Sequence, residues 1–195
     1  MLHPNILAAR HREEALRAIR NHKFDYTENG IAIPSMKLAI GGVFEVAGGD
    51  GVFEVCPNLI PTEGLNHIIG VALNQATQKL AFYLGLFSGD VTVQPTWTGA
   101  NWVANATEFT NYTEATRQLW DNGAVAAGSV SNSALPAVFT MGVGGGTIRG
   151  LVLAEASAKS ATTGVIIAAS RLSVDKAMAQ DEELRAKYTL SATST

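Results

Sequence analysis

The sequence predicts a mainly β protein: an antiparallel β-sandwich with an N-terminal helix and one packing helix, for which a jelly roll is one topology. Three observations predict this class. Short apolar stretches with period-two alternation recur along the chain, and turns rich in Gly, Ser, Asn and Thr separate them. No helical stretch is expected between the late strands, so we expect antiparallel pairing.

The first expected element is a helix over residues 5–22. Pro4 stands near its start, where a missing backbone N–H does no harm. The helix has only a narrow apolar stripe, which is too little to keep four turns stable in isolation. We therefore expect this helix to dock on its own body or on another subunit. The chain therefore divides into an N-terminal helical arm, 1–25, and a β-sandwich body, 26–195. The stripe consists of Ile6, Ala9, Leu16 and Ile19.

A β-hairpin is expected over 37–55. Two copies of the sequence Gly-Val-Phe-Glu-Val, at 42–46 and 51–55, flank an Ala-Gly-Gly-Asp segment. Both copies alternate apolar and polar residues, and Gly and Asp at the bend permit positive φ. The duplication is explained by hairpin geometry, because a repeat protein needs a longer period.

A packing helix is expected over 62–74. Pro61 precedes it, and Glu63 in the first turn suits the helix dipole. Apolar residues recur at i, i+3, i+4, i+7 and i+8, which indicates a single apolar face. His67 lies near this face and is expected to be an edge residue. The apolar face consists of Leu65, Ile68, Ile69, Ala72 and Leu73.

Most of the remaining body is predicted to be strands. The segment 147–155 places leucines on one face and Val152 and Ala154 on the other. Residues 91–113 are expected to be a long, ordered excursion with one helical turn near 100–104. The strand at 80–87 should be buried on both faces, because it is apolar almost throughout. Removing the strand at 184–190 should abolish the fold. The strands are expected at 80–87, 114–120, 137–141, 147–155, 165–169 and 184–190.

We predict no enzyme activity: no catalytic residue, no cofactor and no metal site. The four histidines lack i,i+4 spacing and a neighbouring cluster of further ligands. The glycine-rich run at 142–146 lacks the Lys of a phosphate loop, so we expect a turn or bulge there. Cys56 is expected to be a buried small side chain, and the acidic run 181–183 a solvated turn.

An aromatic-rich segment leaves two interpretations open. Trp97 and Trp102 lie close in sequence to Glu108 and Glu114, among Asn and Thr residues. Exposed rings would suit stacking on sugars, whereas buried rings would fill the core or a contact between subunits. Packing is the favoured interpretation, and the two carboxylates cannot be assigned to glycoside cleavage.

Charge and composition suggest protein partners. Charged residues make up only 16% of the chain, which fits either a surface buried against other chains or one rich in Thr, Ser and Asn. Residues 1–23 hold five basic and two acidic residues, a net +3, and the remainder is net −6. A basic arm on an acidic body can pair with an acidic neighbour. The residues expected to bind a partner are Arg10, Arg12, Leu16, Arg17, Ile19 and Arg20.

Other partner classes are not expected. A net charge of −3 argues against nucleic acid, because neutralising phosphates needs a basic field. No apolar stretch approaches about 18 residues, so we expect no membrane partner, and the N-terminus lacks the pattern of a signal peptide. A single cysteine permits no internal disulfide. Folding in a reducing, intracellular compartment is therefore expected.

Several segments of the body form a recognisable series. They are GLNHIIGVAL (64–73), FYLGLF (82–87), EFTNY (108–112) with Thr116 and Arg117, VFTM (138–141) and ASAKSATTG (156–164). In this order they resemble a group of small structural proteins encoded by tailed bacteriophages, and the resemblance covers residues 26–192. The segments correspond to strands, turns and a packing helix, so no catalytic residue carries over.

The resemblance implies a non-enzymatic virion component, made in many copies in the cytoplasm of the bacterial host. Its partners would be capsid, neck or tail chains, and we expect a homo-oligomer. Decoration or stabilisation of the head or neck is the leading interpretation. A tail or fibre-attachment subunit, or a carbohydrate-binding host-attachment module, is the alternative.

Overall fold

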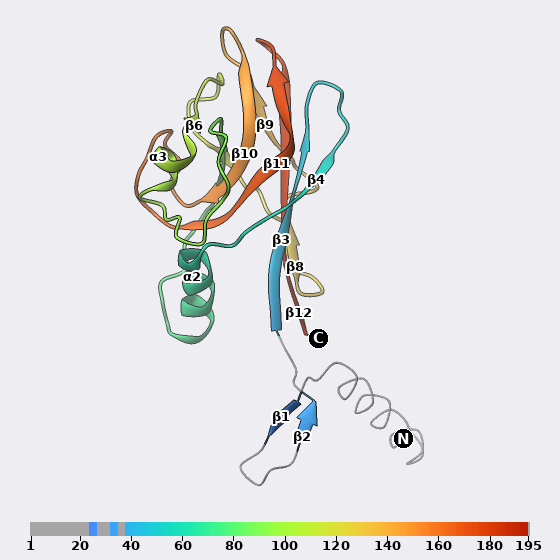
Figure 1. The fold of residues 1–195 in the computed structure, drawn as a ribbon, viewed down its shortest axis with the longest axis vertical. Helices are drawn as coiled ribbons and strands as arrows, with labels where there is room; N and C mark the ends of the chain where they lie inside the picture. The colour runs from blue at the N-terminus through green and yellow to red at the C-terminus, as the bar shows by residue number, and fades with distance from the viewer. Residues whose placement is uncertain (1–23, 27–31, 35–37, 195) are drawn as a thin grey trace. The chain divides into compact units, whose positions relative to one another are not determined.

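A computed structural model describes residues 24–26, 32–34 and 38–194 (Figure 1). The helix expected over 5–22, with its proposed partner-binding residues, lies outside the described residues. The described residues fall into two units: those up to residue 39 belong to one, and residues 40–192 form the other. The division of the chain expected after residue 25 stays a prediction. In the first unit, β1 (Phe24–Tyr26) pairs antiparallel with β2 (Ala32–Pro34).

The body is mainly β, as predicted, and its described strands form two five-stranded sheets. The β12 sheet has the order β4-β3-β12-β8, and β9 also pairs with β12. The β10 sheet has the order β11-β10-β5-β6, and β7 also pairs with β5. The strands of the β12 sheet are β3 (Leu38–Ala47), β4 (Glu54–Pro57), β8 (Ser129–Ser131), β9 (Ala137–Thr140) and β12 (Glu183–Ser194). Those of the β10 sheet are β5 (Tyr83–Phe87), β6 (Glu108–Phe109), β7 (Gln118–Leu119), β10 (Gly146–Ala154) and β11 (Ile166–Met178).

One hydrophobic core draws side chains from both sheets. Phe44 on β3 and Tyr188 on β12 are buried in it together with Leu151 and Leu153 on β10. The rings of Phe44 and Tyr188 lie 4.5 Å apart between centroids. The two sheets therefore share one apolar interior, as expected of a β-sandwich.

A second core lies on the opposite face of the β10 sheet. Val152 and Ala154 are buried there beside Trp97 and Trp102. The covering layer is the segment that leads from β5 into α3 (Trp102–Ala106), which Figure 1 shows beside the β10 sheet. The predicted alternation along 147–155 is confirmed, because each face of β10 packs into a different core.

The β3–β4 hairpin is present but does not pair its two Gly-Val-Phe-Glu-Val copies in register. Phe44 lies opposite Cys56, and β4 begins at Glu54. Gly51 adopts a φ of +69°, its N–H donates to the carbonyl of Gly48, and Asp50 accepts the N–H of Val52. The turn therefore extends beyond the four residues expected and shortens the second strand.

Three predicted strands have different lengths in the structure. β5 begins at Tyr83, and the side chain of Leu80, expected in that strand, is fully exposed. The strand expected over 114–120 is reduced to the two residues of β7. The strand expected over 165–169 is too short, since β11 continues to Met178. In each case the limits depend on which segment lies opposite.

Candidate interaction surface

Helix α2 (Thr62–Leu73) is fixed to the body by its first turn. The carboxylate of Glu63 accepts the backbone N–H of Gly99 and that of Ile166, both at 2.8 Å. The N–H of Thr62 donates to the carbonyl of Pro95 at 3.0 Å. Gly64 lies so close to the carbonyl oxygens of β11 that a Cβ there would clash with backbone. This end of the helix is therefore anchored on two sides.

The rest of α2 exposes apolar side chains to solvent. Leu65, Ile69 and Leu73, spaced i, i+4 and i+8, form a stripe that we call the α2 ridge, and their exposed fractions are 36%, 49% and 83%. Of the apolar face predicted for this helix, only Ile68 is partly buried against the body. The predicted helix is present, but most of its apolar face is exposed, because the body lies opposite Gly64 and Ile68. Figure 1 shows α2 at one end of the sheets.

A groove of about 250 Å³ lies on the body side of the helix. Apolar side chains form most of its lining, and the ion pair between Lys79 and Glu155, with Nζ and Oε1 2.9 Å apart, stands beside it. His67 is half-buried, which agrees with the position expected for it at the edge of the apolar face, and its ring lies edge-to-face with that of Phe82 at 6.0 Å between centroids. We call this the α2 groove, and its main lining residues are Ile68, Val71, Phe82, Trp120, Leu153 and Leu190.

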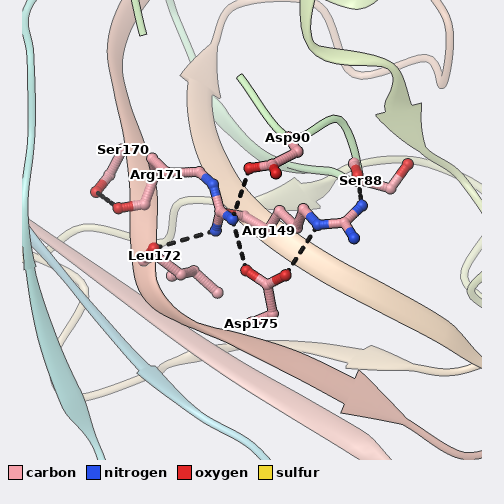
Figure 2. Close-up of polar contacts among 7 residues, drawn as sticks. All are labelled: Ser88, Asp90, Arg149, Ser170, Arg171, Leu172 and Asp175. Atoms are coloured by element: carbon pink, nitrogen blue, oxygen red, sulfur yellow. Dashed lines mark hydrogen bonds and ion pairs between the residues drawn. The ribbon is translucent and has the colours of Figure 1, made fainter. Parts of the chain in front are cut away.

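A charged network occupies a bulge in the β10–β11 ladder. Ile148 pairs with Lys176 and Gly150 pairs with Arg171, so Arg149 lies opposite an extra stretch of β11. The guanidinium of Arg171 donates to the carbonyl of Arg149 at 2.9 Å and to that of Leu172 at 3.1 Å. Arginine thus satisfies backbone oxygens at this irregularity (Figure 2).

Two arginines and two aspartates balance each other in this network. The carboxylate of Asp175 lies 2.9 Å from Nε of Arg149 and 2.6 Å from Nη2 of Arg171, and Asp90 lies 3.0 Å from the same Nη2 (Figure 2). Hydrogen bonds from Arg171 and then Arg149 lower the pKa of Asp175 below its ordinary value. Arg149 also donates to the carbonyl of Ser88 at 2.6 Å. The network therefore joins the loop after β5 to the bulge.

The carboxylates near the aromatic segment hold structural positions. Both oxygens of Glu108 accept from the buried guanidinium of Arg117, at 2.7 and 2.9 Å. Arg117 also lies 4.7 Å from the ring centroid of Trp102. Glu114 accepts the backbone N–H of Thr140 at 3.0 Å. The side chains of Glu114 and Arg117 therefore bond β9 and β6, and only Gln118 and Leu119 of the strand expected at 114–120 form a strand, β7.

Core packing, the favoured interpretation of the tryptophans, agrees with the structure. Trp97 is 3% exposed and Trp102 is completely buried, so neither ring offers a face for stacking on sugar. Cys56 is buried as predicted, and its burial raises the pKa of the thiol. Gly144 and Gly145 adopt positive φ in a turn before β10, as expected for the glycine run.

Two further features are absent from the part of the chain that the structure describes. Among the residues described, no group of three or more His, Cys, Asp or Glu side chains is arranged to hold a metal ion. None of the described helices is long and apolar enough to cross a membrane.

The exposure of the α2 ridge and the charged network are not predictable from the sequence pattern. Period-3.6 spacing identifies an apolar helical face but not what lies against it. Arg149, Arg171, Asp90 and Asp175 are far apart in sequence and come together only through the bulge. A comparison of the sequence with protein-family models gives no match, and neither does a comparison with curated proteins.

Proposed function

We propose that this chain is a non-enzymatic structural subunit of a bacteriophage virion, which decorates or stabilises the head or neck through protein–protein contacts. The observation that carries the proposal is the α2 ridge. Three large apolar side chains on one helix form a surface of the kind that marks contact sites. Isolated exposed leucines would carry no such argument, but these are clustered on one element.

A partner that covers the α2 ridge would gain free energy from apolar burial. Complete burial of one Leu or Ile side chain is worth about 1.5 to 3 kcal/mol. Glu63 and Gly64 anchor the helix at its start, so the ridge is held in place without being covered by the body. A partner that covers Ile69 and Leu73 would gain this energy with little reordering of the helix.

The proposal of a virion protein rests on the segments between residues 64 and 164 that resemble phage structural proteins. The proposed partners (capsid, neck or tail chains) and the proposed synthesis in the host cytoplasm depend on the same resemblance. A tail or fibre-attachment subunit is the alternative. A sugar-binding module built on Trp97 and Trp102 receives no support, because both rings are buried.

The finer topology belongs to the same proposal. We expect the two sheets to pack as a β-sandwich made from in-sheet hairpins, since β3 pairs with β4 and β10 with β11. We do not propose a strict jelly roll, because these two hairpins each pair strands within one sheet. The arm helix over 5–22 remains part of the proposal.

The test compares particle binding by ridge and control variants. Ile69→Gln with Leu73→Gln removes apolar surface without touching the core, and Leu135→Gln is the matched control at another exposed leucine. Purified chains are cosedimented with intact phage heads and, separately, with tails. We expect the control to bind like the wild type and the ridge variant to lose roughly tenfold or more in affinity. Binding to tails alone favours the alternative, and undiminished binding by the ridge variant overturns the proposal.

A further inference from the structure

The α2 ridge and the α2 groove lie on adjacent sides of one helix and need the same kind of cover. Within α2, Glu63 is the acidic residue and its carboxylate is occupied by two backbone N–H groups. Lys79, beside the groove, is paired with Glu155. The surface therefore offers apolar contact and no unpaired charge to the segment that covers it, which is typical of a groove that receives an amphipathic helix.

We propose that residues 1–23 of a second copy of this chain cover the α2 ridge and groove. This inference rests on the proposed function, and it names the surface that the basic arm of the chain binds. The arm sequence carries an apolar stripe from Ile6 to Ile19 that its own residues cannot bury. At 1.5 Å per residue, that stripe would span about 20 Å as a helix, and α2 is about 18 Å long. The two apolar surfaces match in length.

Charge also favours this occupant. Residues 1–23 are net +3, whereas residues 40–192 hold eight basic and thirteen acidic residues, a net −5. Two bodies repel each other, but the arm of one copy is attracted to the body of the next. In a helix, Arg10 and Arg17 lie to one side of the apolar stripe, so they would remain in solvent beside an acidic body while the stripe is buried.

The contact joins different surfaces on the two copies: the arm of one and α2 of the other. Such a heterologous contact leaves a free arm and a free α2 surface at the ends, so it forms rings or extended arrays. An array of this kind suits a component present in many copies on a particle.

The experiment uses mixtures of full-length chains with single added cysteines. Native Cys56 is buried, so the added thiols react selectively. Tagged Leu16→Cys chains are mixed with untagged Leu73→Cys chains, left to exchange, and oxidised. A disulfide between a tagged and an untagged chain can arise only between copies. The control replaces the second chain with Leu135→Cys, an exposed leucine outside the ridge.

We expect the Leu16→Cys and Leu73→Cys pair to cross-link roughly tenfold more than the control pair, because docking raises the local thiol concentration. Equal cross-linking of both pairs overturns the inference. Light scattering over a range of concentrations adds a second readout: the wild type should form oligomers that Leu73→Gln weakens, and a wild type that stays monomeric also overturns it.

Failure of this inference and failure of the proposed function are distinguishable. If the control pair cross-links equally but the ridge variant no longer joins particles, a different virion chain covers the ridge. The inference then fails and the proposed function stands. If the ridge variant joins particles normally and copies do not cross-link at the ridge, both are wrong.

Discussion

Replacing Arg117 with Met should destabilise the body severely. The Arg117 side chain is completely buried, and that of Glu108 is 1% exposed. Besides its two bonds to Glu108, Arg117 donates to the carbonyls of Ala156 and Ala161 at 2.9 and 3.2 Å. Glu108 also accepts the N–H of Ser160. Methionine fills a similar volume, so the change tests the charge and the hydrogen bonds rather than a cavity.

The magnitude follows from what remains after the substitution. Glu108 would keep a negative charge in the interior without its cation, and two backbone carbonyls would lose a donor. Breaking a buried ion pair from one side is expected to lower the free energy of unfolding by about 3 to 5 kcal/mol. For a domain of this size, each kcal/mol corresponds to about 2 to 4 °C in Tm, so the midpoint should fall by about 6 to 20 °C.

Thermal and urea unfolding, followed by circular dichroism and tryptophan fluorescence, provide the assay. Arg185→Met is the matched control, because Arg185 pairs with Glu183 at the surface and such pairs contribute about 0 to 1 kcal/mol. Arg117→Lys should fall between the two, since lysine cannot make the two-point contact with Glu108. A loss below about 1 kcal/mol for Arg117→Met would refute the reasoning.

Three further predictions concern α2, the charged network and the last strand. Gly64→Ala should lower unfolding free energy by about 1 to 3 kcal/mol, because its methyl group would collide with β11 carbonyls; an unchanged urea midpoint contradicts this. Since the pKa of Asp175 is lowered, its contribution is present above the ordinary value of 3.8 and disappears as pH falls through the folded value. The difference in free energy of unfolding between wild type and Asp175→Asn, measured by urea unfolding at several pH values, should therefore disappear only at acid pH. A difference that persists at acid pH contradicts a stabilising role for the ionised Asp175. A chain ending at Glu182 should not fold, because β12 pairs with β8 and β9, and a cooperative melt of that truncation would disprove it.

Much of the fold could be predicted from local pattern. Period-two alternation along 184–190 reflects strand geometry, in which successive side chains point to opposite faces, and Leu184, Ala186 and Tyr188 are buried as that rule requires. The turn at Gly144 and Gly145 likewise follows from the positive φ that glycine tolerates. These features depend on a few neighbouring residues, so the sequence alone determines them.

The exposure of the α2 ridge and the bulge opposite Arg149 depend on contacts between segments that are distant in sequence. The first turn of α2 touches β11, and that contact leaves Leu65, Ile69 and Leu73 in solvent although they share the helix's apolar face. The bulge opposite Arg149 depends on how two long strands pair.

The sequence by itself determined a mainly β body with an alternating last strand, a hairpin near residue 50 and a helix that begins at residue 62, because each is set by backbone geometry and side-chain period. The tertiary structure decided which apolar side chains stay exposed, where strands stop, and that Glu108 and Arg117 form a buried pair. Burial and ion pairing depend on what lies opposite a residue in space, and a linear pattern does not contain that information.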